Sequence, residues 1–432
     1  MDFNYTDTQD MLRDTLARFL ADTYDFESRK KMIASDAGRD PGIWRALATE
    51  LGILSAPFSE EQGGLGGGAI ENLIMMEELG KVIAVEPYLQ TVVIGGGALK
   101  AVGGALADAV IPEIIGGNVI IGFAYAEPKG RYNLANISTT AKKDGAGYVL
   151  NGHKAVVYAA PWATHLLVTA RTGGSQRERA GVDLFLIDAK SAGITRRDYP
   201  TVDGFRASEV YFENVAIPGD ALLSGGIDLI EQIVDEATVA VCGEACGVTR
   251  KLHEGTLDYS KQRQQFGQPI GRFQVLQHRM ADMFLEVEQI MSMTLMATLK
   301  LDLPAAERKA MVSLAKAKVS RSAKFVGQNA VQTHGGIGIT QELQQSFTTE
   351  NGVVVFLGLP MEMRISAAAM ACRGLPRLRL AGMRFSVLLR TRLTRSVLPQ
   401  GFRHPGRQTR LFLVFRGFFH AHILHASLLT CR

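Results

Sequence analysis

Two glycine-containing stretches decide the fold of this 432-residue chain: YSKQRQQFGQPIGRFQ at residues 259–274 and QTHGGIGIT at residues 332–340. The first lies at the end of a helical period that runs from Ile227 to about Arg263, and the second follows two more such segments, from Gln274 to about Leu301 and from Ala305 to about Thr333. Three long helices with short links predict a helical bundle.

The sequence preceding this bundle, from about Val119, changes to short apolar or alternating runs such as YVLNGHKAVVY and VDLFLIDA. Turn residues separate the runs at intervals of about ten residues, and no long helix intervenes, which favours an antiparallel sheet or barrel over a doubly wound fold. No GxGxxG motif opens a helix here, which argues against a Rossmann cofactor site.

The first part of the chain has a helical pattern again. Thr6 and Gln9 form a predicted capping box, followed by an apolar face of Met11, Leu12, Leu16, Phe19 and Leu20. The sequence thus predicts an α+β fold in four parts: an N-terminal helical domain at 1–118, a middle antiparallel β-barrel domain at 119–226, a C-terminal helical bundle at 227–345, and a tail at 346–432.

The tail differs in charge from the rest of the chain. Residues 363–432 contain thirteen Arg and no Lys, Asp or Glu, whereas residues 1–362 contain 34 basic and 43 acidic residues. A solvated surface normally mixes both signs. The Arg residues alternate with Leu, Phe and Val instead of clustering, which argues against a nucleic-acid-binding arm. We interpret residues 346–432 as an aberrant Arg-rich tail, for which a shifted reading frame is one explanation.

The remaining composition is that of a globular enzyme. Four cysteines in so long a chain give neither a disulfide framework nor the spacing of a metal site, so we expect no metal and a cytoplasmic location. No apolar run approaches the length of a transmembrane helix, and the polar start MDFNYTDTQD does not resemble a signal peptide.

The order of these parts and the pattern YxxxRxxFGxPIxxFQ, with QxxGGxG further on, resemble the acyl-CoA dehydrogenase family over about residues 1–343. Stretches such as EEQGGLGGGAIE and RFQVLQHRMADMF are similar to one subgroup, the small subunit of pimeloyl-CoA dehydrogenase. The resemblance implies a C-terminal four-helix bundle and FAD as the cofactor.

The resemblance also implies which residues bind FAD. Arg263 offers several fixed donors to the pyrophosphate, and Phe266 would lie beside the adenine end. Gln332, Gly335 and Gly336 fit a close backbone approach to the FAD of a neighbouring subunit.

In the β domain the chain departs from the family pattern. Ala126 stands where the family's flavin-contacting segment has Thr, and Val156, Val157 and Tyr158 replace Trp-Ile-Thr over the ring. The Tyr158 hydroxyl can substitute for the missing threonine.

The catalytic base of the family is not visible in this sequence. Removing the α-proton of an acyl-CoA requires a base, which is a glutamate in most members of the family that this chain resembles, but the two positions that carry it there fall at Leu359 and Ala237. Asp235 and Glu236 face other directions on the helix, and Glu244 lies two turns further on. We expect all three to be solvated or salt-bridged helix residues, so the catalytic residue stays unknown.

Taken together, the sequence predicts an FAD-dependent acyl-CoA dehydrogenase subunit. It would oxidise a saturated acyl-CoA to the 2-enoyl-CoA and pass electrons to an electron-transfer flavoprotein; the sequence leaves open whether the acyl group is dicarboxylyl. The resemblance implies a homo-oligomer, or a hetero-oligomer whose second dehydrogenase subunit supplies the base. The alternatives are a non-catalytic structural partner subunit, and a flavin monooxygenase or acyl-CoA oxidase on the same fold.

Overall fold

The computed structural model describes residues 5–130 and 133–339. Helices come first, strands occupy the middle, and long helices follow, which confirms the predicted fold class. The helices are α1 (Asp7–Thr23), α2 (Phe26–Ala34), α3 (Pro41–Thr49), α4 (Ala69–Val82), the π-helix η3 (Leu89–Gly96), α5 (Gly97–Val102), α6 (Gly104–Ile115), α7 (Gly226–Gln262), α8 (Gln274–Thr298) and α9 (Ala305–His334), with short 3-10 turns η1 (Ile53–Ser55), η2 (Glu60–Gln62), η4 (Gly219–Ala221), η5 (Ile270–Arg272) and η6 (Gly335–Ile339).

The first helix begins as the sequence predicts. The Thr6 hydroxyl accepts from the backbone N–H of Gln9 at 3.3 Å, and the Gln9 side chain accepts from the backbone N–H of Thr6 at 3.0 Å, which completes a capping box. Leu16 and Leu20 are buried, but Met11 is 66% exposed, so its predicted place on the apolar face is wrong.

The middle part is one mixed sheet. Its strands are β1 (Ile121–Ala124), β2 (Thr140–Asp144), β3 (Gly147–Tyr158), β4 (His165–Arg171), β5 (Val182–Asp188), β6 (Ile194–Pro200), β7 (Arg206–Ile217) and β8 (Leu222–Leu223). They follow the order β6-β7-β3-β2-β4-β5-β8, and β1 pairs with β4. Most pairs are antiparallel, as predicted, but β1–β4 and β2–β4 are parallel, which the sequence pattern did not indicate.

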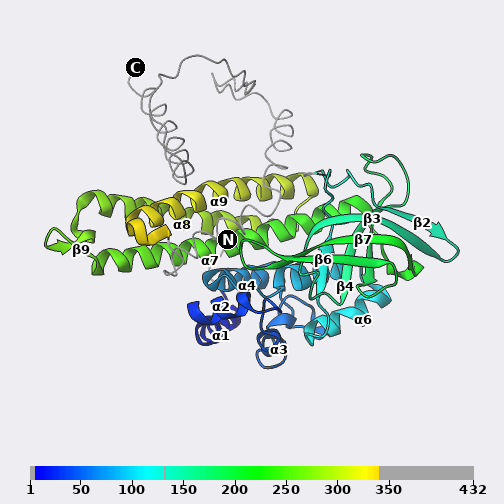
Figure 1. Ribbon diagram of the computed structural model, residues 1–432, viewed down its shortest axis with the longest axis horizontal. Coiled ribbons are helices and arrows are strands. Elements are labelled where there is room, and N and C mark those ends of the chain that lie inside the picture. The colour runs from blue at the N-terminus through cyan, green and yellow to red at the C-terminus, as the bar shows by residue number, and fades with distance from the viewer. Residues whose placement is uncertain (1–4, 131–132, 340–432) are drawn as a thin grey trace, which may run out of the picture. The chain divides into compact units, whose positions relative to one another are not determined.

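The long helices α7, α8 and α9 lie side by side, with α4 along α7 (Figure 1). A two-residue hairpin, β9 (Gln264–Gln265) with β10 (Gln268–Pro269), links α7 to α8. A fourth helix of the predicted bundle would lie outside the described residues, as does the predicted tail. Within the described part of the chain, no helix is both long and apolar enough to cross a membrane.

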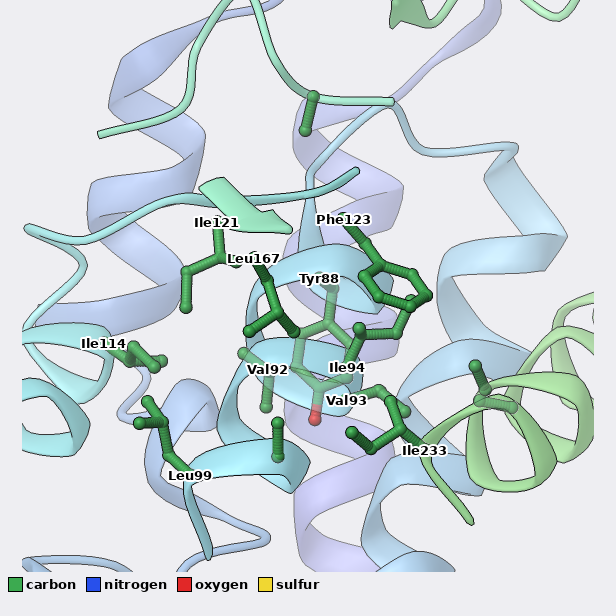
Figure 2. Packing of buried hydrophobic residues seen from close by; sticks show 14 of the residues in the cluster. Tyr88, Val92, Val93, Ile94, Leu99, Ile114, Ile121, Phe123, Leu167 and Ile233 are labelled. Carbon is green, nitrogen blue, oxygen red and sulfur yellow. The ribbon is translucent and has the colours of Figure 1, made fainter. Parts of the chain in front are cut away.

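A shared apolar core joins the three parts. It contains residues of η3, of strand β1 and of α7, among them Val92, Val93, Ile121 and Ile233, all of which are less than a tenth exposed. Figure 2 shows these side chains converging around the π-helix together with Tyr88 and Phe123. The sheet and the helices are therefore fixed against each other around η3, where the candidate site lies.

Glycines allow α4 and α7 to approach unusually closely. A Cβ at Gly80 would lie 2.2 Å from the Glu244 carbonyl oxygen, and one at Gly247 would lie 1.9 Å from the Glu77 carbonyl oxygen. Backbone atoms cannot move aside as a flexible side chain can, so any larger residue must push the two helices apart.

We expect Gly247→Ala to lower the melting temperature. Overpacking costs about 1–3 kcal/mol, which exceeds the roughly 1 kcal/mol that Ala gains over Gly inside a helix. Thermal unfolding followed by circular dichroism measures the change. Gly173→Ala is the control, because a Cβ there meets nothing within 4 Å. Equal melting temperatures for the two variants would show that the helices do not depend on this close contact.

Candidate active site

A cavity of about 530 Å³ lies between the sheet and the helices. The C-terminal part of α4 and the segment after it, together with η3, form one wall; β1, β3 and the loop before β7 form another; and α7 forms the third. The lining residues are Met76, Leu79, Ile83, Ala84, Val85, Glu86, Tyr88, Leu89, Gln90, Ile94, Phe123, Tyr125, Ala126, Val156, Tyr158, Asp203, Phe205, Val234, Ala237, Thr238, Val241 and Glu244.

The sheet wall is aromatic and contains both predicted flavin-contacting residues, Ala126 and Tyr158. Phe123 and Tyr125 stack with ring centroids 4.9 Å apart, and Tyr158 meets Phe205 edge to face at 5.8 Å. Burial is the main reason why the pKa of the Tyr158 hydroxyl is raised, so this group stays protonated and can donate a hydrogen bond.

A strained bulge forms part of the same wall. The β3–β7 register shifts between Lys154 and Val157, and Val156 within it has a φ of 53°. A β-branched residue rarely adopts this left-handed conformation, and such strain concentrates at binding sites. Val156 is 42% exposed, and it lines the cavity. The sequence offered no signal for this bulge.

A buried ion pair anchors this wall from behind. Lys154, fully buried, donates to Glu127 at 2.8 Å and to the Thr169 hydroxyl at 3.0 Å, while the backbone N–H groups of Ser138 and Thr139 also donate to Glu127. Burial alone would raise the pKa of Glu127, but Lys154 and these donors lower it to about 2. Glu127 therefore stays ionised and holds the segment that begins at Ala126.

The α7 wall presents residues that recur at helical spacing. Ala237, Val241 and Glu244 are at i, i+4 and i+7, so they share one face, and all three line the cavity. Ala237, one of the two positions predicted for the base, lines the cavity and carries no carboxylate. The other, Leu359, lies outside the described residues.

Of the neighbouring carboxylates, one behaves as expected and two do not. Glu236 is half-buried, burial raises its pKa, and its partner is the neutral Gln232 instead of a cation. Asp235 forms an ion pair with Arg308 at 3.0 Å, and Glu236 accepts a hydrogen bond from Gln232 at 3.1 Å. Glu244 was expected to be solvated or salt-bridged, which is wrong: it lines the cavity, and within residues 5–130 and 133–339 its carboxylate has no hydrogen-bond or ion-pair partner. Its spacing from Ala237 was the signal that could have identified it.

The environment of Glu244 favours its neutral form. Burial raises its pKa to about 8, and the nearby charge of Asp203 acts in the same direction, while Lys316 and Arg29 act against it. Arg29 fixes this end of the cavity, because its guanidinium donates to the carbonyl oxygens of Ile83 at 2.6 Å and Asp203 at 2.8 Å.

A second acid, Glu86, belongs to the opposite wall, but its side chain is fully buried behind the cavity surface. The Tyr24 hydroxyl donates to its Oε1 at 2.8 Å, and Arg39 Nη1 lies 3.7 Å from its Oε2. Burial raises the pKa of Glu86 to about 7 despite these two partners. Sequence reasoning did not single out this residue, because a lone Glu between helices carries no pattern.

The other predicted cofactor residues gather at the far end of α7. Tyr259 stacks on His334 with centroids 4.3 Å apart, which brings the end of α7 next to the end of α9. Arg263 and Gln332 are both exposed there. Phe266 is 91% exposed and has a φ of 53° at the tip of the hairpin, so it is both strained and unburied in this chain.

The two glycines at this end have no close neighbours in the part of the chain that is described. A Cβ at Gly335 or Gly336 would meet nothing within 4 Å, although Gly335 needs its φ of 67° to end α9. No described residue of this chain makes the close approach predicted for them.

Comparison with known proteins identifies the chain. Models of the N-terminal, middle and C-terminal domains of acyl-CoA dehydrogenase match residues 6–117, 122–215 and 224–353. The chain belongs to the acyl-CoA dehydrogenase family. Members of this family are oxidoreductases that act on CH–CH groups, and FAD is their cofactor.

Curated relatives and solved structures agree with this assignment. A probable acyl-CoA dehydrogenase of Bacillus subtilis is 29% identical over 357 residues, covering 79% of this chain and 91% of that protein. The human mitochondrial short-chain specific acyl-CoA dehydrogenase is 29% identical over 304 residues, covering 68% and 73%. The FAD complex of PigA superposes with a TM-score of 0.79 at 26% identity, covering 86% of this chain and 99% of that one.

The residues at the cavity fit a flat flavin ring. Aromatic side chains line the sheet wall, the bulge interrupts the β3–β7 pairing at Val156, and Tyr158 provides a hydroxyl donor. The opposite α7 face is apolar at Ala237 and Val241, which suits a hydrocarbon chain lying against that ring.

We expect the melting temperature of the protein to fall as pH rises from about 5 to 8. The folded pKa of Glu244, about 8, exceeds its ordinary value of 4.5, so the folded state holds a proton that the unfolded state has lost, and stability decreases through this window. Glu244→Gln should reduce the fall, whereas Glu254→Gln, at an exposed position of the same helix, should not. Identical pH profiles for wild type and Glu244→Gln would contradict the buried, neutral state of this acid.

Proposed function

We propose that this chain is the flavin-binding subunit of an acyl-CoA dehydrogenase that oxidises a saturated acyl-CoA to the 2-enoyl-CoA and passes electrons to an electron-transfer flavoprotein. The single observation that carries the proposal is the cavity, whose aromatic sheet wall faces an apolar helix wall. FAD, when bound, would accept the hydride that leaves the β-carbon, and the proton that leaves the α-carbon would pass to a base that a second subunit supplies. The chain's own residues position the ring, exclude water and hold the acyl chain.

The separation between Ala237 and Arg263 supports an assembly of subunits. Ala237 lies on α7, and Arg263 directly follows the helix, 26 positions further along the chain. At 1.5 Å per residue, the two are about 39 Å apart along the helix axis. An extended dinucleotide is shorter than this distance, so an FAD whose ring occupies this cavity cannot reach Arg263 of the same chain. Arg263, Phe266, Gln332, Gly335 and Gly336 would then contact the cofactor of a neighbouring subunit.

Exposed apolar side chains on the bundle are consistent with such an assembly. They lie on the hairpin, α8, α9 and η6, where a monomer would leave them in water: Phe266, Val275, Phe284, Leu285, Leu314, Phe325 and Ile337. Apolar surface of this kind typically marks a protein interface. We propose an oligomer in which these faces meet.

A second candidate function follows from Ala237. With no carboxylate at this position, the chain would complete the flavin site of another dehydrogenase subunit without catalysing oxidation itself. The resemblance to the pimeloyl-CoA dehydrogenase small subunit and a cytoplasmic location stay predictions.

Flavin reduction distinguishes the two functions. The purified protein should be yellow, and anaerobic addition of a saturated acyl-CoA should bleach the flavin absorbance. Bleaching only after a second subunit is added would favour the structural role. A protein that holds FAD and is not reduced by any acyl-CoA, alone or with the proteins that copurify with it, would contradict the proposed function.

We expect Arg263→Ala to weaken FAD binding about tenfold or more, because a hydrogen-bonded contact to a charged group contributes about 1.5–3 kcal/mol. FAD released per protein chain after dialysis, and titration of the apoprotein with FAD, measure this. Lys261→Ala is the matched control, since Lys261 is exposed two positions away and pairs with Asp258. Equal FAD affinity in the two variants would exclude Arg263 from the cofactor site.

A further inference from the structure

Two segments outside β3 and β7 hydrogen-bond to the bulge at Val156. The β3–β7 register shifts so that Ala155 and Val156 both stand opposite Glu209. The Ala155 N–H donates to the Ala126 carbonyl oxygen at 2.8 Å, and the Val156 N–H donates to the hydroxyl oxygen of Tyr199. Backbone donors inside a protein need such partners, so these two bonds help to define the shape of the bulge.

Tyr199 reaches the bulge from the edge of the sheet. It lies on the edge strand β6, and β7 separates β6 from β3. Tyr199 pairs with Ala207 of β7, and Ala207 pairs with Tyr158 of β3, so these three residues share one face of the sheet. Tyr158 lines the cavity. The small side chain of Ala207 leaves room for the Tyr199 ring to cross β7 on this face.

Glu209 fixes the direction of the Tyr199 hydroxyl. The hydroxyl donates to Glu209 Oε1 at 3.1 Å, and His153 Nε2 lies 2.6 Å from Glu209 Oε2. Burial and the charge of Glu209 raise the pKa of Tyr199 to about 12, so the phenol keeps its proton. Because that proton is directed at Glu209, the hydroxyl oxygen can accept from Val156.

The backbone conformation of Val156 depends on contacts of this kind. A β-branched residue with a φ of 53° is strained, and such a conformation persists only where the surrounding structure over-determines it. Val156 lines the cavity on the same wall as Ala126 and Tyr158, the two predicted flavin-contacting residues. The Tyr199 hydroxyl therefore acts on the wall against which a flat ring fits.

We propose that Tyr199, held by Glu209, is a positioning residue of the flavin site, whose hydroxyl keeps Val156 in the conformation that borders the ring. This rests on the proposed function, because it places the flavin ring in this cavity. Neither Tyr199 nor Glu209 belongs to the cavity lining, so both act through Val156.

Tyr199→Phe tests the proposal, because it removes one oxygen atom and keeps the ring. We expect FAD to bind the apoprotein about three- to tenfold more weakly, the effect of one lost hydrogen bond, and the absorption bands of the bound flavin to shift. Tyr211→Phe is the matched control. Tyr211 lies on β7 two positions from Glu209, is 38% exposed, and stacks on His153 through its ring, which the substitution keeps.

Hydrogen exchange of the apoprotein measures the bulge in the absence of the cofactor. Peptides that contain Val156 should exchange faster in Tyr199→Phe than in wild type or Tyr211→Phe, because the Val156 N–H has lost its acceptor.

A double-mutant cycle with Val156→Gly separates positioning from general stability. Glycine adopts a positive φ without strain, so the bulge of Val156→Gly no longer needs the Tyr199 hydroxyl to hold it. The loss of FAD affinity on Tyr199→Phe should therefore be smaller in the Val156→Gly background than in wild type. An equal loss in both backgrounds would show that Tyr199 does not act through Val156.

Failure of this inference and failure of the proposed function give different results. If the wild-type apoprotein bound no FAD, the proposed function would fail, and this inference with it. If wild type bound FAD and Tyr199→Phe matched Tyr211→Phe in FAD affinity and flavin spectrum, the proposal would be overturned while the dehydrogenase function stood. That conclusion would hold even if Tyr199→Phe exchanged faster or melted at a lower temperature, because those changes alone indicate only a structural role.

Discussion

The close contact between α4 and α7 is the constraint on which the site depends. Glycines at 80 and 247 let the two backbones approach to a distance at which a single methyl group would collide with a carbonyl oxygen. This contact joins the N-terminal helices to the bundle and brings Glu244 of α7 beside the end of α4. Since Arg29 ties the same end of α4 to the loop at Asp203, the sheet is held against both helices, and a cavity remains where the three parts meet.

Burial and electrostatics act in opposite directions within this cavity. Aromatic and aliphatic side chains dominate its walls, which favours an apolar acyl chain beside a flat ring. The same burial raises the pKa of Glu86 to about 7 and the pKa of Glu244 to about 8. By contrast, Glu127 behind the sheet wall is kept ionised by Lys154. Glutamate side chains thus have two different states in this protein. Glu127 is held ionised as an anchor of the sheet wall, whereas Glu86 and Glu244 have pKa values near neutral pH.

The sequence predicted the order of the three parts and most of their elements, because helical and strand periodicity are local properties. It missed β6, whose pattern ITRRDYP is largely polar and exposed, and the two parallel pairings, which depend on long-range contacts. At the site, motif resemblance led to Arg263, Phe266 and Tyr158. It did not lead to Glu86 or Gln90, or to the strain at Val156, because burial, an orphaned acceptor and a bulge arise only when segments distant in sequence are packed together.

The central claim is that the cavity between η3, α7 and the sheet receives the acyl chain against the flavin. A crystal structure of the FAD-loaded protein with a 3-thiaacyl-CoA, a thioether analogue that cannot form the 2-enoyl product by the normal route, tests it most directly. The account predicts that the acyl carbons contact Ala237 and Val241 and that the chain ends near Gln90 and Glu244, with the ring beside Tyr158. An acyl chain bound elsewhere, with this cavity filled by side chains or by the flavin alone, would contradict it.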